Sequence, residues 1–599
     1  MALVSELRQW QQRGKIGGSD SGVSDQIIAL QKETGLSAIT LRVCILRGLE
    51  TVQSIQEYLS PRFENLKNPF SIMDMDRAIE RLALAREKNE KILIFGDYDV
   101  DGTAGTALLS WIFRDLDFQY DARQPDRFKD GYGLNVGAVE GAHREGITLL
   151  VTVDCGISSF DAASCAKNLG IDLIVIDHHQ IDPKKGLPLA YAVINPQRVD
   201  CKSGLKQLCG CGLAFYVAMA LRSYGRQKAW FATRPEPNLK QHLDLVVMAT
   251  AADMVPLVGD NHILVRYGLD VLKHSEKPGV KALLQAAGLA SKDLSPSHLG
   301  FVLGPRINAS GRMQSASLAL ELLTTEDSDR AEELATELEN LNAERAVLQN
   351  QIWDEVRVRI EKGIAEGKYQ HGIAVADSDW HEGVVGIVAS RVTETFHKPA
   401  AVIALREDFG KGSVRSFAGK DVLGALRECA PFLLGFGGHR YAAGLSVAIE
   451  QFEFFAAEFD RVVGNMEQEK NAGALMIEGS CFIDELDVKS LQELEKLGPF
   501  GPGNPEPVFA MRASAKSHRV LKGRHLKLNL SSARSATFLR PAMIEAIWFH
   551  AAERKDVMGV AGVLEEEHEW AGVPELNRFR GQMTPSFRVR DWRKVEFKV

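Results

Sequence analysis

The sequence predicts an α/β protein with a parallel-sheet domain, a long connecting helix, a second smaller α/β domain and a small C-terminal β domain. Three observations support this prediction. Short β-branched runs at residues 91–95, 147–153 and 172–176 alternate with helix-like sequence, as in the central strands of a helix-covered parallel sheet. Leucine and isoleucine recur at helical spacing between residues 328 and 364. Behind a Pro/Gly-rich corner at residues 497–509, alternating runs such as HLKLNL are typical of a small barrel.

The length and composition agree with a globular protein of several domains. The 599 residues are 45% hydrophobic and 25% charged, and this length predicts about three to five domains. We expect an N-terminal helical region (1–70), the parallel-sheet domain (71–325), the long helix (326–366), the second α/β domain (367–465) and the β domain (466–599).

The two middle elements follow from local pattern. Leu334, Leu338, Leu341, Leu348 and Ile352 lie at spacings of four, three, seven and four on a background of Glu and Arg. One amphipathic helix through this stretch would extend about 50 Å, long enough to bridge two domains. Behind it, GIAVAD (372–377), a helix-like GVVGIVASRVTE and PAAVIAL (399–405) repeat the strand–helix–strand pattern of an α/β domain.

Several classes of protein are disfavoured. No apolar run approaches the roughly 18 residues of a membrane span, and the first residues lack a secretory signal, so we expect a cytoplasmic protein without membrane contact. The eight cysteines form no paired C-x-x-C motifs. Cys201, Cys209 and Cys211 cluster, and we interpret them as reduced thiols in preference to a zinc site.

The net charge of −8 taken alone argues against a nucleic-acid ligand, but the charge is unevenly distributed. Residues 512–540 contain eight Lys and Arg and no acid, so the remaining chain has 63 basic and 79 acidic residues, a net −16. Such a block indicates either a local anion-binding face or a solvated strand. Its first six cations are Arg512, Lys516, Arg519, Lys522, Arg524 and Lys527.

Acidic residues follow each of the three predicted strands. GDYDVDG places Asp97, Asp99 and Asp101 directly after the first strand, at alternate positions that would face one side of an extended chain. The second strand ends at Asp154, and the third ends at Asp177-His178-His179. Because open α/β sheets bind ligands beyond the carboxyl ends of their strands, we expect these groups to converge.

Converging carboxylates repel one another unless cations neutralise them. Aspartates suit Mg²⁺ and Mn²⁺, and imidazole nitrogens shift the preference toward Mn²⁺ or another transition metal. The number of acids predicts two ions, which about 4 Å apart would hold the attacking and leaving oxygens of a phosphoester.

Simpler interpretations exist for each pattern alone. D-x-D-x-D-G is also found in calcium loops, but TAGTALLSWIFR continues as a helix without the spaced Glu of an EF-hand. Asp154 alone would serve as a helix cap, and His178 with His179 as a surface pair. Taken together, the three clusters favour a metal site.

The ordered motifs resemble the DHH phosphoesterase superfamily, which is named for the triplet at residues 177–179. GDYDVDG, VTVDCGI, VIDHH and ATAADMVPL, which contains Asp253, are similar to its four motifs. GSVRS (412–416) and GFGGHRYAAG (435–444) resemble the DHHA1 domain that follows DHH domains. The Pro/Gly corner and basic block resemble an oligonucleotide-binding (OB) fold. Within the superfamily, the chain is similar to single-strand-specific 5′→3′ DNA exonucleases from about residue 91 onward.

The resemblance implies two divalent ions, Mn²⁺ or Mg²⁺, and a set of ligands. Many superfamily members have a metal-binding His where this chain has Phe95, so the division of the first three aspartates between the ions stays open. His179 is expected to contact the scissile phosphate, with Asp154 as the other catalytic residue. The implied ligands are Asp97, Asp99, Asp101, Asp154, His178 and Asp253.

The resemblance also implies phosphate and DNA contacts. Ser413, Arg415 and Arg127 are expected to bind a terminal 5′ phosphate, although Arg127 also fits a simple exposed arginine. In GGHRYAAG, glycine N–H groups can approach an anion, with a plain turn as the simpler interpretation. The full set of expected contacts is Arg127, Arg306, Asn308, Arg312, Ser413, Arg415, Ser416, Gly437, Gly438 and His439, with the six basic-block cations on the OB face.

The implied function is a metal-dependent exonuclease that degrades single-stranded DNA from the 5′ end to mononucleotides in recombination and repair. The alternatives are a DHH phosphodiesterase of short oligoribonucleotides or cyclic dinucleotides, and an inactive single-strand-binding scaffold. The basic block disfavours the first, and the intact motif acids and histidines disfavour the second. The expected partners are single-stranded DNA, a single-stranded-DNA-binding protein and a recombination helicase, and we expect a monomer.

Overall fold

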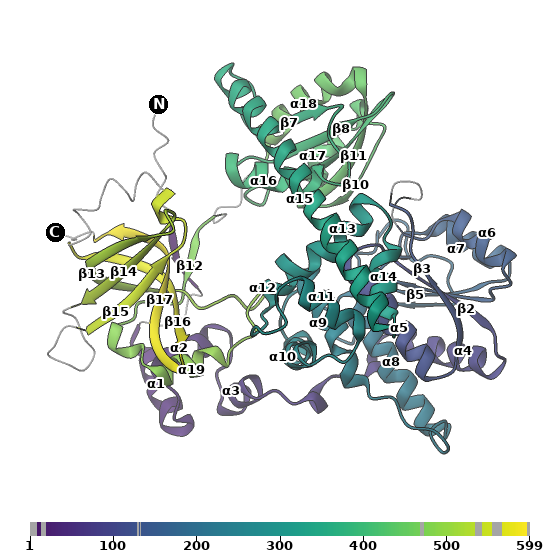
Figure 1. The fold of residues 1–599 in the computed structure, drawn as a ribbon, viewed down its shortest axis with the longest axis horizontal. Coiled ribbons are helices and arrows are strands. Elements are labelled where there is room, and N and C mark those ends of the chain that lie inside the picture. Colours follow the sequence, from purple (N-terminus) through teal and green to yellow (C-terminus); the bar gives the residue numbers. More distant parts are fainter. Residues whose placement is uncertain are drawn as a thin grey trace. The chain divides into compact units, whose positions relative to one another are not determined.

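The structure is a computed structural model that describes residues 9–13, 20–127, 131, 133–467, 473–532, 542–553 and 566–595 (Figure 1). The chain forms two compact units. One comprises residues 66–472, and the other combines residues 1–65 with residues 473–599.

A five-stranded parallel sheet begins the larger unit. The strands predicted from β-branched runs are its three central strands, which are almost fully buried. Helices α6 and α7 contribute apolar side chains to the core on one face, and α4, α5 and α8 contact the sheet as well. The sheet order is β3 (Gln119–Arg123), β2 (Lys91–Gly96), β4 (Leu149–Val153), β5 (Asp172–Ile176) and β6 (Ala192–Ile194). The helices are α4 (Met75–Glu87), α5 (Val100–Asp115), α6 (Val136–Arg144), α7 (Phe160–Asn168) and α8 (Gly210–Gln227).

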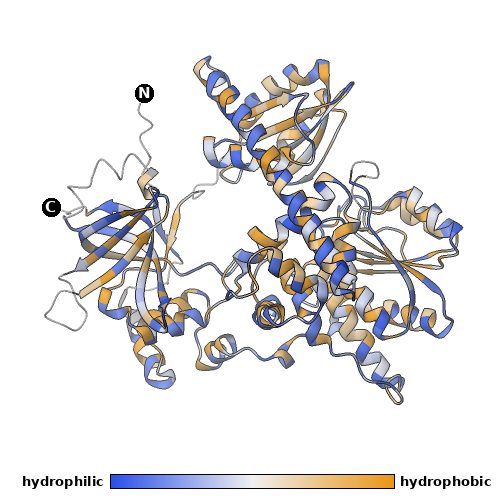
Figure 2. Cartoon of the chain, viewed as in Figure 1, coloured by the Kyte–Doolittle hydropathy of each residue, from blue (hydrophilic) through white to orange (hydrophobic). Residues whose placement is uncertain are grey.

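A helical layer follows the sheet and leads to α15 (Ser328–Ala365), whose 38 residues correspond to about 57 Å. Hydrophobic and hydrophilic residues alternate along this helix (Figure 2). Its first half contacts α11, α13 and α14, whereas Ile352, Trp353, Val356 and Ile360 join the core of the next sheet. The layer contains α9 (Leu243–Ala252), α10 (Asp260–Lys273), α11 (Pro278–Ala286), α12 (Pro296–His298), a π-helical turn (Leu299–Leu303), α13 (Gly304–Met313) and α14 (Ser317–Thr324).

A second, mixed five-stranded sheet completes the larger unit. Its central strands separate two apolar cores, one with α15 and α16 and the other with α17 and α18. The order is β10 (Gly435–His439), β11 (Ala442–Ala448), β9 (Phe409–Arg415), β8 (Ala400–Leu405) and β7 (Ile373–Asp377). The helices are α16 (Val385–Phe396), α17 (Val422–Glu428) and α18 (Phe452–Asn465).

The smaller unit contains a closed barrel, which confirms the predicted β fold. Leu41 and Ile55 from the N-terminal helices belong to the same buried core as Leu497, Phe509 and the barrel interior. The N-terminal helices therefore fold with the barrel rather than as a region of their own, and β1 (Trp10–Gln12) pairs with β12 (Leu475–Ile477). The barrel order is β13 (Phe509–Leu521), β14 (His525–Ser532), β15 (Ala542–Trp548), β17 (Gln582–Lys594) and β16 (His568–Phe579). Its helices are α1 (Asp20–Thr34), α2 (Ala38–Leu46), α3 (Val52–Leu59) and α19 (Val488–Glu495).

In the part of the chain that the structure describes, no helix is long and apolar enough to cross a membrane.

Candidate metal centre and phosphate pocket

The three aspartates of GDYDVDG lie between β2 and α5 but not on an extended strand. Asp99 is the N-cap of α5, where its Oδ1 accepts hydrogen bonds from the N–H groups of Asp101 (2.9 Å) and Gly102 (3.1 Å). Asp101 lies in the first turn of that helix. The alternating-strand argument was therefore wrong in its geometry, because the chain turns into a helix at Asp99.

The N-terminus of α8 holds Asp101 in place. The N–H of Gly210 donates to Asp101 Oδ2 (2.6 Å), and the N–H of Cys211 donates to Asp101 Oδ1 (2.8 Å). A Cβ on Gly210 would lie 2.6 Å from the Cβ of Asp154, so only glycine permits this approach. The positive end of a helix favours a carboxylate at this position.

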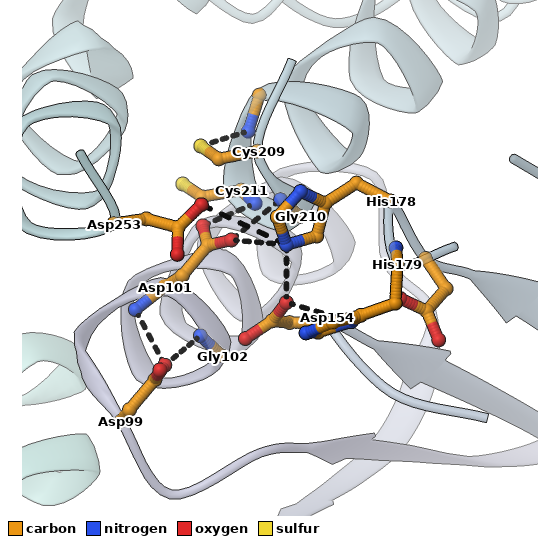
Figure 3. A network of polar contacts seen from close by, with 12 residues as sticks. Asp99, Asp101, Gly102, Asp154, His178, His179, Cys209, Gly210, Cys211 and Asp253 are labelled. Atoms are coloured by element: carbon orange, nitrogen blue, oxygen red, sulfur yellow. Dashed lines mark hydrogen bonds and ion pairs between the residues drawn. The ribbon is translucent and has the colours of Figure 1, made fainter. Parts of the chain in front are cut away.

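Asp154 lies next to His178, on which the contacts from Asp101, Asp154 and Asp253 converge (Figure 3). The backbone of Asp154 adopts a left-handed conformation with φ of 60°, and the residue is 2% exposed. His178 Nε2 lies 3.1 Å from Asp154 Oδ1 and 3.7 Å from both Asp101 Oδ2 and Asp253 Oδ2. These four side chains come from the first turn of α5, the segments that follow β4 and β5, and the end of α9, so all four sequence motifs meet here.

The clustered side chains form overlapping groups that could hold metal ions. Within each group, one ligand atom per residue lies within 4.8 Å of the others. Asp154 is shared by two groups and His178 by two, which suits two neighbouring cations. The groups are Asp97 with Asp99 and Asp154, Asp101 with His178 and Asp253, and Asp154 with His178 and His179.

The electrostatics of the cluster also favour cations. Burial, followed by repulsion from neighbouring aspartates, raises the pKa of Asp97, Asp99 and Asp154, and raises the pKa of Asp253 to about 8. Among the described residues, Asp97 Oδ1 is buried without a hydrogen-bond partner. Carboxylates with one or two imidazoles therefore fit Mn²⁺ or Mg²⁺, whose charge would offset this repulsion.

Phe95, which precedes the first acidic motif, is an apolar core residue. The side chain is 3% exposed and packs in the apolar core on one face of the parallel sheet. Asp97 lies in the same group as Asp99 and Asp154. Asp97 is therefore a candidate metal ligand of the first motif, and Phe95 is not.

Asp177 is a partner of His179 rather than a member of the metal groups. Its carboxylate accepts from the N–H of Ile157 (2.9 Å) and the N–H of His179 (3.1 Å), and lies 2.7 Å from His179 Nδ1. Burial opposes protonation of His179, but the hydrogen bond and the charge of Asp177 outweigh it and raise the pKa of His179 to about 9. This role of Asp177 was not predicted.

The second sheet contributes His439 to the same place. The His439 ring lies 6.0 Å from the His179 ring, with an interplanar angle of 8°. Burial and the nearby His179 and His178 lower the pKa of His439. The sequence placed His439 among the phosphate contacts, and the structure places it beside the metal cluster.

A cationic cavity of about 590 Å³ adjoins the cluster. Arg415 Nη1 donates to Ser413 Oγ (2.6 Å) and to the carbonyl of Val414 (2.9 Å). The guanidinium of Arg127 lies 5.2 Å from the centre of the Tyr98 ring, so the cavity is joined to the GDYDVDG loop. Burial, then the charges of Arg127, Arg345 and Arg415, lower the pKa of Arg312 to about 9. The cavity also includes Gly437 and Gly438.

Three of the expected phosphate contacts do not line the cavity. Arg306 forms a two-point ion pair with Glu339 of α15 (2.5 and 3.1 Å), so its guanidinium joins α13 to the long helix. Ser416 Oγ donates to the carbonyl of Lys420 (2.6 Å). Neither residue lines the cavity, and Asn308 does not line it either.

Two cations of the basic block form ion pairs with acids of neighbouring strands, and four others are exposed. Arg512 is paired with Glu569 (2.9 Å) and Lys527 with Glu545 (2.6 Å), because the strands that carry these acids are adjacent in the barrel. The exposed cations gather toward the β13–β14 hairpin and are Lys516, Arg519, Lys522 and Arg524. Arg534 and Arg540 lie outside the described residues.

Sequence reasoning missed residues that act through the backbone or across the chain. Gln124 Nε2 donates to the carbonyl of Asp97 (2.6 Å) and to Thr103 Oγ1 (2.7 Å), which supports the first acidic loop. Cys211 was noted only as part of a cysteine cluster, and Gly210 was not noted at all. All eight cysteines are free thiols.

Two sheets joined by a long helix, with clustered carboxylates and histidines beside a cationic cavity, define a DHH-type metal-dependent phosphoesterase. Residues 91–250 match the DHH family N-terminal domain, residues 369–465 the DHHA1 domain, and residues 477–591 the RecJ OB domain. The chain belongs to the RecJ family.

Known relatives extend over most of the chain. It is 39% identical over 505 residues to the single-stranded-DNA-specific exonuclease RecJ of Escherichia coli, covering 82% of this chain and 86% of that protein. The RecJ of Bacillus subtilis is 31% identical, with 96% and 70% covered. The structure of Thermus thermophilus RecJ in complex with Mn²⁺ aligns with a TM-score of 0.80 at 27% identity, covering 98% of this chain and 80% of that one.

Proposed function

We propose that this protein is a metal-dependent exonuclease that degrades single-stranded DNA in the 5′→3′ direction and releases mononucleotides. The observation that carries this proposal is the cationic cavity beside the metal cluster, both within one compact unit. A terminal phosphate bound in the cavity would place the next phosphodiester near the clustered carboxylates. The names of the relatives supply the single-strand substrate.

Two divalent ions, Mn²⁺ or Mg²⁺, fit the carboxylates and histidines described above. Asp97, Asp99 and Asp154 would hold one, and Asp101, His178 and Asp253 the other. When bound, such ions activate water and stabilise negative charge on a phosphoryl group. His179, held by Asp177, faces the same centre and would donate a hydrogen bond to the scissile phosphate.

The cavity would account for the preference for a strand end. Arg415, Ser413 and Arg127 present a guanidinium pair and a hydroxyl that suit a phosphomonoester. An internal phosphodiester has one negative charge, whereas a terminal phosphate has up to about two. The cavity would therefore select a strand end over an internal position, and the 5′ end is the one this proposal assigns to it.

The variant Arg415→Glu is expected to remove any preference for a 5′-phosphorylated strand over a 5′-hydroxyl strand. Loss of the charge-assisted contacts and repulsion by the new carboxylate should lower kcat/KM for the phosphorylated strand by about 10²-fold. Steady-state kinetics on both strands measure this. Arg427→Glu, at an exposed arginine of the same domain, is the control. A preference unchanged by Arg415→Glu contradicts the assignment.

The barrel would retain the polymer between cuts. OB folds bind single strands through a cationic groove and stacking aromatic side chains, with little sequence preference. Lys516, Arg519, Lys522 and Arg524 supply exposed positive charge on and beside one hairpin. Because Arg512 and Lys527 are held in ion pairs with glutamates, we infer that these two contribute less to binding of the strand.

Replacing Arg519 and Lys522 together by Glu is expected to weaken binding of long strands and reduce the salt dependence of that binding. Each lost phosphate contact lowers the slope of log K against log salt by about one. Titrations at several salt concentrations give the slope. Arg512→Gln, which removes a cation already paired with Glu569, should change it less. Equal changes in both variants would refute this division.

Two other functions fit the structure less well. A phosphodiesterase of short oligoribonucleotides or cyclic dinucleotides has no use for the cationic barrel. An inactive single-strand-binding scaffold has no use for the intact carboxylate cluster. A role in recombination and repair, alongside a single-stranded-DNA-binding protein and a helicase, follows from the family and is part of the proposal.

The proposed function is tested by comparing single-stranded and duplex DNA of one sequence in Mn²⁺, in Mg²⁺ and with a chelator. We expect hydrolysis of the single strand with either metal, little hydrolysis of the duplex, and none with the chelator, because the ions that the carboxylates and histidines would hold activate the attacking water. Hydrolysis that persists with the chelator, or equal hydrolysis of the duplex, contradicts the proposal.

A further inference from the structure

The cationic cavity extends beyond the residues that a terminal monophosphate needs. In an antiparallel sheet, directly paired residues point to the same face, and the face repeats every second residue. The register of β9, β11 and β10 therefore places three rows of side chains on the cavity face. They are Arg415 with Ala442 and His439, Ser413 with Gly444 and Gly437, and Lys411 with Ser446 and Gly435.

These rows run away from the metal cluster along the strands. The first row contains His439, which lies against His179. The second contains Ser413, whose hydroxyl is bonded to Arg415. The third row, with Lys411 and Ser446, lies about 7 Å beyond the second, because adjacent rows are two positions apart along each strand. The middle row has glycine on two of its three strands, so no side chain of β10 or β11 blocks the path between Ser413 and Lys411.

The third row is part of the same cavity and adds positive charge. Lys411, Gly435 and Ser446 line the cavity together with Ser413 and Arg415. Among the described residues that line it are four cations, Arg127, Arg312, Lys411 and Arg415, and one carboxylate, Glu382. Lys411 Nζ lies 3.8 Å from Glu382, and Arg406 lies 3.6 Å from the same carboxylate. Among these described lining residues, the net excess of three positive charges exceeds the roughly two negative charges of a phosphomonoester.

We propose that the cavity accepts strands with a 5′-triphosphate, with the first phosphate at Ser413 and Arg415 and the outer phosphates directed toward Lys411 and Ser446. This inference rests on the proposed function and names a further substrate of the same site. The outer phosphates follow the glycine row, and the Lys411 ammonium and Ser446 hydroxyl supply donors at its far end. A strand whose synthesis began with a nucleoside triphosphate has such a 5′ end.

The reaction on such an end follows from the position of the cavity. Water adds to the phosphorus that joins the first and second nucleotides, the bond from that phosphorus to the 3′ oxygen breaks, and the 3′ oxygen leaves with a proton as a hydroxyl. The products are a nucleoside 5′-triphosphate and a strand shortened by one nucleotide that carries a 5′-monophosphate. The triphosphate linkages stay intact, so the first product differs from all later ones.

The experiment uses three single-stranded DNAs of one sequence with a 5′-hydroxyl, a 5′-monophosphate or a 5′-triphosphate. We expect the kcat/KM for the triphosphate strand to lie within about tenfold of that for the monophosphate strand. A tenfold change corresponds to the loss or gain of about one charge-assisted contact. Anion-exchange chromatography of the first product should show a nucleoside triphosphate. An uncut triphosphate strand, or a first product that is a monophosphate or a longer fragment, overturns the inference.

Two variants separate the third row from the rest of the cavity. Lys411→Ala should lower kcat/KM for the triphosphate strand about tenfold and leave the monophosphate strand within about twofold. Arg406→Ala removes the other cation beside Glu382, does not line the cavity, and should leave both strands unchanged. Equal effects of Lys411→Ala on both strands would overturn the assignment of Lys411 to the outer phosphates.

Binding measured without catalysis keeps the two proposals distinguishable. In an Asp154→Asn background, fluorescence titration should show tighter binding of the triphosphate strand than of the hydroxyl strand, and Lys411→Ala should weaken only the triphosphate complex. Equal binding of triphosphate and hydroxyl strands overturns the inference. Failure of the wild-type protein to cleave the monophosphate strand contradicts the proposed function, whatever the binding result.

Discussion

Replacing Asp154 by asparagine is expected to abolish hydrolysis of single-stranded DNA, with a loss in kcat of at least about 10³-fold, since a metal-held phosphoryl centre depends on several kcal/mol of charge stabilisation. Asp154 belongs to two of the three candidate metal groups and lies 3.1 Å from His178. Asparagine is preferred over alanine as the test because the backbone is left-handed at this position, and asparagine tolerates that conformation. The measurement is single-turnover cleavage in Mn²⁺.

The effect of Asp154→Asn on the stability of the metal-free protein can also be predicted. Burial and neighbouring carboxylates raise the pKa of Asp154, so its charged form is disfavoured in the metal-free protein. Removing that charge should leave thermal stability in chelator unchanged or increased. Single-strand binding should persist through the barrel. Asp161→Asn, at an exposed position in α7, should retain full activity. Turnover retained in Asp154→Asn would refute the two-metal assignment.

Replacing Asp177 by asparagine is expected to lower kcat by about 10- to 100-fold, the range for partners that orient an active-site histidine, with metal affinity nearly unchanged. Asp177 accepts hydrogen bonds from two backbone N–H groups and lies 2.7 Å from His179 Nδ1. An asparagine amide cannot supply the same acceptors or the negative charge. His179 would lose both its orientation and the stabilisation of its charged form.

Two measurements distinguish this positioning role from metal binding. Steady-state kinetics should show the loss in kcat with KM little changed, and a Mn²⁺ titration monitored by calorimetry should give a similar dissociation constant for the variant and the wild type. Asp182→Asn, just beyond the triplet, is the matched control at an exposed aspartate. A parallel loss of Mn²⁺ affinity would contradict the separation of Asp177 and His179 from metal binding.

The candidate site was largely predictable because it lies at the ends of strands. Asp97, Asp154 and His178 each follow a buried β-branched run, and parallel strands bring their carboxyl ends to one edge. Asp253 was found by resemblance, since no strand precedes it. Asp177 and Gly210 were missed because their roles depend on hydrogen bonds and close approaches between segments far apart in the sequence.

The fold was predictable where elements are buried and regular. The central strands β2, β4 and β5 and the helix α15 have strong periodic or apolar patterns, whereas β3 is polar and β6 has only three residues. The pairing of α1–α3 with the barrel could not be inferred, because these short helices complete their core with residues more than 400 positions later in the chain.

The net charge of the chain has a functional meaning only when the positions of its charged residues are known. The net −8 includes a carboxylate cluster that fits cations, and a cationic cavity in the same unit. The basic block identified the barrel, but two of its cations are paired with glutamates from adjacent strands. Nothing in the sequence near Arg512 or Lys527 indicates these partners.

The central claim is that one strand end, the 5′ end, is bound in the cavity while the adjacent phosphodiester is cut at the metal cluster. The most direct test is a time course on one single strand labelled at either its 5′ or its 3′ end, with Mn²⁺ present. We predict that the 5′ label appears at once as a mononucleotide, whereas the 3′ label stays on progressively shorter strands. Immediate release of the 3′ label, or internal fragments from both strands, would contradict the account.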